Sequence, residues 1–351
     1  MATFWFIVLA ILWSGFMVLE GFDFGVGVLH RWVGRDDESR RALIATIGPV
    51  WDGNEVWLIT AAAATFAAFP GWYATMFSGY YLALVLLLVA LILRGVAIEF
   101  RGRRDSARWR NRWSAVLAGS SIVAPLVVGV ALADLLYGLP IDANQEFTGS
   151  FFTLFNGYSV LTGVTFAAIS LLHGAAFLMM KTDRELHDRS ARVARSLAPV
   201  AVVAVFATVI WTHVLGDHGF LLNVVELTAL VAALAAWWLV REGRPGGAFT
   251  ATTVTIAGVV LALFTNLYPR VMVSSLGARF DLTIHNTASA PYALKVMTVI
   301  VSIFLPGVLI YQGWAYHVFR KRVAGPIAHV ETGEPEGTNS LSGASPARRP
   351  S

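Results

Sequence analysis

The sequence predicts an all-α membrane protein whose chain crosses the bilayer nine times. Hydrophobic residues make up 56% of the 351 residues and charged residues only 14%, whereas a soluble domain of this size carries about a quarter charged residues. The mean hydropathy is +0.65. The apolar residues fall in nine blocks of roughly 20, and about 20 helical residues cross a hydrocarbon layer of about 30 Å.

The nine blocks are expected to be helices, because a helix satisfies all of its own backbone hydrogen bonds in lipid. Together they form a membrane domain over residues 1–322, which we expect to be built as two four-helix bundles plus one extra helix. In chain order the predicted spans are 4–29, 43–69, 75–98, 114–137, 151–180, 196–215, 219–240, 248–268 and 290–319. Residues 323–351 are rich in Gly, Pro, Ser and Glu, which predicts a disordered cytoplasmic tail.

The first block is expected to remain in the mature chain as a membrane helix. It lacks the basic residues that begin a secretory signal, and it is longer than the apolar core of such a signal. It also carries Glu20 and Asp23 where cleavage would need small residues.

The positive charges of the loops predict the orientation. Of the 26 Lys and Arg residues, 23 fall on one side of the predicted spans, including Arg94 at the end of the third span. Arg270 and Arg279 fall on the opposite side, and Lys295 lies within a span. Because cytoplasmic loops are enriched in Lys and Arg, the N-terminus is expected outside and the C-terminus in the cytoplasm. The net charge of +4 therefore indicates loops beside anionic lipid headgroups rather than a nucleic-acid groove.

Four acidic residues lie inside the predicted spans, where a carboxylate is costly. Glu20 and Asp23 belong to the first span, and Asp52 and Glu55 to the second. Each pair is spaced i, i+3, so each pair lies on one helix face. Asp52 is expected about seven residues, or roughly 10 Å, into its span. All four acids are therefore expected at similar depth near the cytoplasmic ends of two neighbouring antiparallel helices.

Two interpretations of these acids remain open. In a structural role, they cap helix ends or form ion pairs with Arg31, Arg35 or Arg94. In a functional role, they form a proton-conducting cluster open to the cytoplasm, because crowded and partly desolvated carboxylates can hold and release protons near neutral pH. The neighbouring run GFDFGVG (21–27) indicates close helix packing rather than a dinucleotide-binding loop, since no strand precedes it.

The residue types predict no redox centre in this chain. The sequence has no cysteine, which excludes disulfides, iron–sulfur clusters and zinc ribbons. Of the eight histidines, His173, His213 and His317 fall within or at the edge of the predicted spans. His173 lies near the inner end of the fifth span and His213 near the outer end of the sixth, so the two cannot hold one haem iron. We therefore expect no catalytic residue, cofactor site or metal site here.

Five stretches of the sequence resemble one known family. They are GFDFGVGVLHRWVGRDDESRR (21–41), PVWDGNEVWLITAAAATFAAFPGWYATMFSGYY (49–81), RGVAIEFR (94–101), RWRNRW (108–113) and DLTIHNTASAPYALKVMTVI (281–300). The single residues that match the motifs are Gly21, Phe22, Asp23, Gly25, Trp51, Asp52, Gly53, Asn54 and Arg94. The chain thus resembles subunit II of the cytochrome bd-type quinol oxidases (the cytochrome d ubiquinol oxidase subunit II family), whose nine helices also match the predicted count.

The resemblance implies a haem-free subunit that works with a second chain. In this family, subunit I carries haems b and d and the quinol site. The heterodimer oxidises quinol, reduces O2 to water and generates a proton-motive force in the bacterial or archaeal cell membrane. Small accessory subunits, and a quinone or lipid in a groove of this chain, are compatible with the resemblance.

Carried over residue by residue, the resemblance assigns Asp52 to a cytoplasmic proton pathway and Trp57 to an oxygen-access path. Asp23 also matches the family. Glu20 and Glu55 join the expected proton pathway as the neighbouring acids. Glu55 stands where some members have Gln, so its role rests on its position and not on the resemblance.

A stand-alone proton-coupled transporter is the alternative from a different functional class. It would explain acids inside the membrane, and it predicts inverted repeats and helices broken by Gly or Pro near the midplane. Pro125 and Pro199 are candidates for such breaks, but they do not form a matched pair. A purely structural scaffold is a third interpretation.

Overall fold

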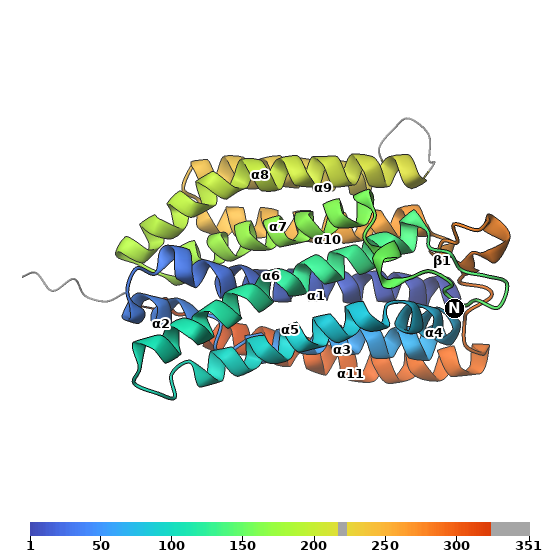
Figure 1. Cartoon of the computed structure of the whole chain (residues 1–351), viewed down its shortest axis with the longest axis horizontal. Coiled ribbons are helices and arrows are strands. Elements are labelled where there is room, and N and C mark those ends of the chain that lie inside the picture. The colour runs from blue at the N-terminus through green and yellow to red at the C-terminus, as the bar shows by residue number, and fades with distance from the viewer. Residues whose placement is uncertain (217–222, 324–351) are drawn as a thin grey trace, which may run out of the picture.

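The structure is a computed structural model that describes residues 1–216 and 223–323. The described chain is dominated by helices (Figure 1). They are α1 (Ala2–Val33), α2 (Asp37–Ala45), α3 (Trp51–Ala68), α4 (Pro70–Gly79), α5 (Tyr81–Phe100), α6 (Ala107–Tyr137), α7 (Gly157–Lys181), α8 (Arg184–Gly216), α9 (Val224–Arg241), α10 (Pro245–Leu267) and α11 (Pro291–Val318). The segment between α10 and α11 holds a short antiparallel pair of strands, β1 (Arg270–Met272) and β2 (Leu282–Thr283). The predicted tail falls outside the described residues, apart from its first residue.

Eight helices in the described ranges are long and apolar enough to cross a membrane, so the chain is an integral membrane protein. They are α1 and α5 to α11. Of the nine predicted spans, 43–69 has no counterpart among these eight. Its main helix, α3, has 18 residues and begins with the polar run Asp52 to Glu55, which lowers its hydropathy. The count of nine and the orientation therefore stay predictions.

The second predicted span is wrong at its beginning. One continuous helix was expected over 43–69, but α2 ends at Ala45 and α3 begins at Trp51. Pro49 lies in the gap, and proline disfavours the helical conformation of the residue before it. Consequently Asp52 lies in the first turn of α3 and not about seven residues into a helix.

Neither of the candidate prolines breaks its helix. Pro125 lies inside α6, and Pro199 lies inside α8, which begins at Arg184 rather than near residue 196. The broken helices that a transporter would need are therefore not found at these two positions. The loop predicted between the spans 196–215 and 219–240, apart from its first residue, lies outside the described residues.

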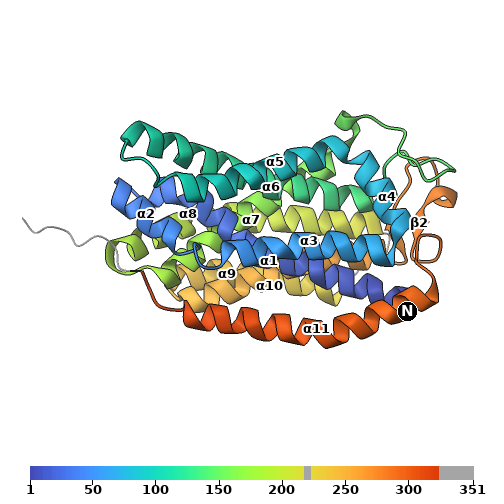
Figure 2. The same ribbon diagram turned by 90° about the horizontal axis from the view of Figure 1, so that it is seen from below.

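Helix α1 occupies the centre of the molecule (Figures 1 and 2). It packs against α3, α6, α7 and α10, while α7 to α10 also pack on one another. One large apolar cluster extends through all of these helices, so the two expected bundles share a core. Helix α11 runs along one edge of the molecule and packs against α3 (Figure 2). This arrangement surrounds the acids of α1 with other helices.

A close helix contact joins α1 to α7 at two glycines. A Cβ atom on Gly25 would lie 2.2 Å from the carbonyl oxygen of Ser170 and 2.7 Å from the Cα atom of Gly174. Small residues allow membrane helices to approach in this way. The expectation that the glycine run packs a helix closely is therefore confirmed at Gly25.

We expect Gly25→Ala to destabilise the protein by about 1–3 kcal/mol, because an added methyl group must push α1 away from the α7 backbone. The measurement is the thermal unfolding midpoint in detergent. Gly119→Ala in α6 is the matched control, because nothing lies within 4 Å of the Cβ atom that it would gain. Equal midpoints for the two variants would contradict the close contact.

Candidate functional site

A buried ion pair forms the centre of the candidate site. Arg94 of α5 pairs with Glu20 of α1, and the side chains of both residues are 0% exposed. The Arg94 Nη1 atom also lies 3.7 Å from the Oε2 atom of Glu55 on α3, whose side chain is 23% exposed. The guanidinium lies over the ring of Phe24, with 5.0 Å to the ring centroid. One cation thus joins three helices. Ion pairing with Arg94 was the structural interpretation considered for the acids, and it holds for Glu20 and Glu55.

A hydrogen-bonded chain continues from this centre towards α11. The Nδ2 atom of Asn54 donates to the Oδ2 atom of Asp23 over 2.7 Å, and both side chains are buried. The Oδ1 atom of Asn54 accepts from the Tyr316 hydroxyl at 2.7 Å and from the Gln312 amide at 3.3 Å. Trp57 donates its indole N–H to the Oε1 atom of Gln312 over 2.9 Å. Asn54 therefore holds the Asp23 carboxylate between α1, α3 and α11.

The structure brings together three of the four predicted acids. Glu20 interacts electrostatically with both Asp23 and Glu55. Asp52 is exposed, so it is not buried with the other three acids. The displacement follows from the late start of α3, which leaves Asp52 in its first turn.

Asp52 instead lines a surface pocket between α3 and α11. The pocket has a volume of about 400 Å³ and also reaches Asn54, Trp57, Gln312 and Tyr316. Asp52 also interacts electrostatically with Glu55. An exposed carboxylate and the buried chain that ends at Asp23 therefore share one pocket.

Trp57 separates two pockets on this edge of the molecule. It lines the pocket of Asp52 and a second pocket of about 510 Å³ between α1, α10 and α11. Its ring packs on Gly15, where a Cβ atom would lie 2.8 Å from the ring. The side chain is half-buried, and its position depends on the hydrogen bond to Gln312.

The remaining motif residues support the helices around this centre. Phe22 stacks on Phe177 of α7 with 4.3 Å between the ring centroids. The ring of Trp51 packs against α5, where a Cβ atom on Gly95 would lie 3.2 Å from it. Gly21 faces α7 and α10, whereas nothing lies within 4 Å of a Cβ atom built on Gly53.

Sequence reasoning named Arg94 as a possible partner of the acids, but it missed two residues of α11. Arg94 was counted with the loop charges, but it is buried within α5. Gln312 and Tyr316 were not singled out, although their spacing of four puts two polar groups on one face of an apolar helix. That spacing is the signal that could have identified them.

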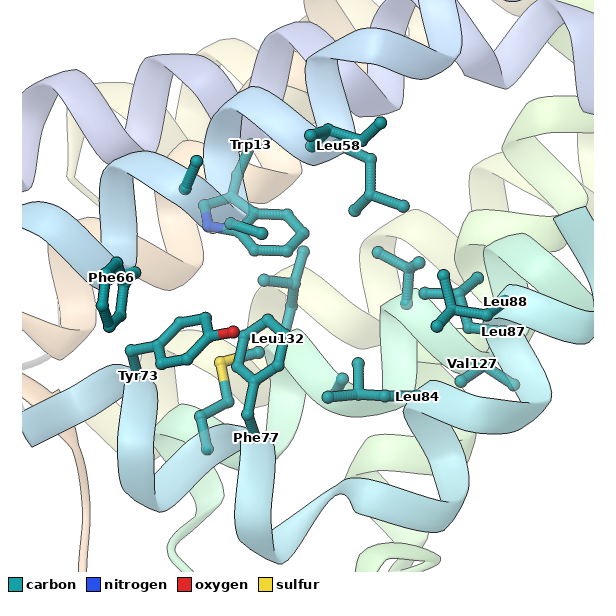
Figure 3. A pocket seen from close by; sticks show the side chains of 16 residues that line it. Trp13, Leu58, Phe66, Tyr73, Phe77, Leu84, Leu87, Leu88, Val127 and Leu132 are labelled. Carbon is teal, nitrogen blue, oxygen red and sulfur yellow. The ribbon is translucent and has the colours of Figure 1, made fainter. Parts of the chain in front are cut away.

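A third pocket is almost entirely apolar and opens between α1, α3, α4, α5 and α6 (Figure 3). Its volume is about 420 Å³. Among its lining residues, Trp13 has a buried indole N–H that has no hydrogen-bond partner in the described structure. Tyr73 lines the same pocket. The pocket therefore offers a large apolar surface, and a buried indole N–H without a partner belongs to one of its walls.

The histidines within helices have partners of their own. His173 is buried, contacts the Thr252 hydroxyl at 2.6 Å through Nδ1 and stacks on Phe249. His213 contacts the Oε2 atom of Glu226 at 3.0 Å. His30, expected just outside the first span, is buried inside α1, which continues to Val33. Across residues 1–216 and 223–323, no group of three His, Cys, Asp or Glu side chains is arranged to hold a metal.

Known proteins match this chain over most of its length. A family model described as cytochrome bd terminal oxidase subunit II matches residues 1–319. The chain is 42% identical over 324 residues to cytochrome bd ubiquinol oxidase subunit 2 of Bacillus subtilis. The alignment covers 91% of this chain and 96% of the Bacillus subtilis protein. It is 34% identical over 350 residues to cytochrome bd-I ubiquinol oxidase subunit 2 of Escherichia coli K12. That alignment covers 89% of this chain and 92% of the Escherichia coli protein.

A solved structure has the same fold. A chain of the bd oxidase from Geobacillus thermodenitrificans superposes with a TM-score of 0.70 at 16% identity, covering 90% of this chain and 96% of that chain. The family model and the two relatives confirm the resemblance found in the early helices. The chain belongs to the cytochrome bd terminal oxidase subunit II family.

Proposed function

We propose that this chain is the haem-free subunit of a quinol oxidase in the bacterial cell membrane. A partner subunit I would carry haems b and d, oxidise quinol and reduce O2 to water, and the complex would generate a proton-motive force. The names of the relatives support the oxidase assignment. The observation that supports a specific role for this chain is that exposed Asp52 lines the same pocket as Asn54, whose amide donates to the buried carboxylate of Asp23.

The proposed role is to take up protons from the cytoplasmic side. Reduction of one O2 to two waters consumes four protons and four electrons. Asp52 would accept protons in the pocket, and Asn54 and Tyr316, which line the same pocket, would orient the buried carboxylate of Asp23 behind it. The charges of Glu20, Glu55 and Arg94 would set the electrostatic potential at the Asp23 carboxylate, because charges interact strongly where water is scarce. A membrane potential results if these protons come from inside while quinol releases its protons outside.

We expect Asp52→Asn to lower quinol oxidase turnover by about tenfold or more, since it removes an exposed proton acceptor and leaves the packing unchanged. The measurement is oxygen consumption by the purified complex, together with its haem content. Asp52→Glu should keep much of the activity because the carboxylate remains.

Glu38→Gln is the matched control, because Glu38 is another exposed acid on the predicted cytoplasmic side, in α2. Its turnover should equal that of the unmodified complex. Normal turnover in Asp52→Asn, or loss of assembly in that variant, would argue against the proton role of Asp52.

The second proposed role is oxygen access beside Trp57. O2 is small and apolar, so it concentrates in the bilayer and needs an apolar passage. The 510 Å³ pocket next to Trp57 is lined almost wholly by apolar groups and lies between membrane helices. Gly313 lines this pocket, and nothing lies within 4 Å of a Cβ atom built on it.

We expect Gly313→Leu to narrow this pocket and raise the apparent KM for O2 several-fold, while the KM for quinol stays unchanged. The measurement is oxygen consumption at low O2 concentration. Gly307→Leu on the same helix is the matched control, because its Cβ atom also meets nothing within 4 Å and Gly307 does not line this pocket. Equal KM values for O2 in both variants would rule out access through this pocket.

The apolar pocket of Figure 3 is proposed to hold an isoprenoid quinone or a lipid as a structural component. Its walls suit a hydrocarbon chain, and the unpaired N–H of Trp13 suits a carbonyl oxygen, which favours the quinone. The described structure offers that N–H no partner of its own.

We expect Ala63→Phe to fill this pocket and to remove about one quinone per complex from the purified protein. The measurement is quinone extraction with quantification by mass spectrometry. Trp13→Phe should weaken retention while keeping the ring. Unchanged quinone content in Ala63→Phe, or a loss of phospholipid instead, would contradict the quinone assignment.

A further inference from the structure

A charged pocket lies at the end of the helices that the loop charges predict to be cytoplasmic. It is formed by α2, the end of α5 and the start of α6, and its volume is about 390 Å³. Its lining includes the four arginines Arg41, Arg101, Arg104 and Arg110. None of the pathways proposed above uses this pocket.

Ion pairs hold two of these arginines in place. Asp37 pairs with Arg101, and its Oδ2 atom also lies 3.0 Å from the Nε atom of Arg110. Arg110 further contacts Asp105 at 2.7 Å. Arg101 also donates from its Nε atom to the Ser114 hydroxyl over 2.8 Å. These contacts fix α2 to the turn between α5 and α6, and they give the pocket a rigid frame.

The other two arginines keep their charge available to a ligand. Arg41 and Arg104 have no carboxylate within 4.0 Å among residues 1–216 and 223–323. Arg104 lies over the ring of Trp109, with 4.4 Å to the ring centroid, which orients its guanidinium. Glu99 also lines the pocket. The lining therefore holds two guanidinium groups and one carboxylate that form no ion pair within the described residues. The pocket thus has a net attraction for an anion.

The surroundings of the pocket favour a lipid over a free ion. Ile44 and Ile98 give it an apolar floor. Val85 and Ile92 are exposed on α5 at a spacing of seven, and Glu99 continues the same stripe to the rim of the pocket. An acyl chain could therefore lie along α5 while its headgroup occupies the pocket.

We propose that this pocket binds the phosphate group of an anionic phospholipid through Arg41 and Arg104. A guanidinium presents paired N–H donors that match phosphate oxygens, and basic pockets beside membrane helices at the cytoplasmic face bind such headgroups. The lipid would brace α2 against α5 and α6 at the membrane surface.

The test is native mass spectrometry of the purified complex after exchange into nanodiscs of phosphatidylglycerol or of phosphatidylcholine. The unmodified complex should retain phosphatidylglycerol in preference to phosphatidylcholine. The double variant R41Q/R104Q should retain phosphatidylglycerol about 30-fold less, because two guanidinium contacts are lost. Both side chains are exposed, so haem content and thermal midpoint should be unchanged.

The double variant R192Q/R195Q is the matched control, because it removes two exposed arginines of the same predicted side from α8. Its lipid retention should match that of the unmodified complex. Equal losses in both double variants would show diffuse attraction and overturn the site. Equal retention of both lipids, or displacement of phosphatidylglycerol by inorganic phosphate, would overturn the lipid assignment.

Discussion

The buried ion pair between Arg94 and Glu20 is the constraint on which the candidate site depends. A single charge at this depth would be costly, and removing one partner of a buried pair typically costs about 3–5 kcal/mol. The pair therefore fixes α5 against α1, and the contact of Arg94 with Glu55 adds α3. Because the three helices meet at one cation, their relative positions along the membrane normal are set by charge as well as by apolar packing.

Helix α11 is attached to the rest of the chain by hydrogen bonds between neutral polar groups instead of an ion pair. Most of α11 is exposed and apolar, including Ile303, Phe304 and Ile310, so packing on the rest of this chain holds it weakly. Gln312 and Tyr316 make hydrogen bonds to α3 from half-buried positions. The same bonds orient Asn54 towards Asp23, so one set of contacts both holds a helix and places a carboxylate.

The sequence was sufficient for the helical fold and for part of the site. Hydropathy located most membrane helices, and the spacing of Glu20 and Asp23 placed both on one buried face of α1. The same reasoning failed for Asp52, because hydropathy cannot show that the helix restarts after Pro49. Arg94 was one of three candidate partners for the acids, but which arginine pairs with which acid could not be derived from the sequence. The partners of Asn54 could not be derived either, because they depend on which helices become neighbours. The spacing of Gln312 and Tyr316 marks one polar face of α11, but it gives no indication of which residues are their partners.

The central claim is that the protons used in oxygen reduction enter at Asp52 and pass to the buried carboxylate of Asp23, which Asn54 holds. The most direct test is proton uptake by the reduced, reconstituted complex during a single turnover with O2, followed with a pH-sensitive dye on the side of α2. Asp23→Asn should slow this uptake by at least about tenfold while haem content and quinol binding stay normal. Uptake at the unmodified rate from the α2 side in that variant would contradict the account.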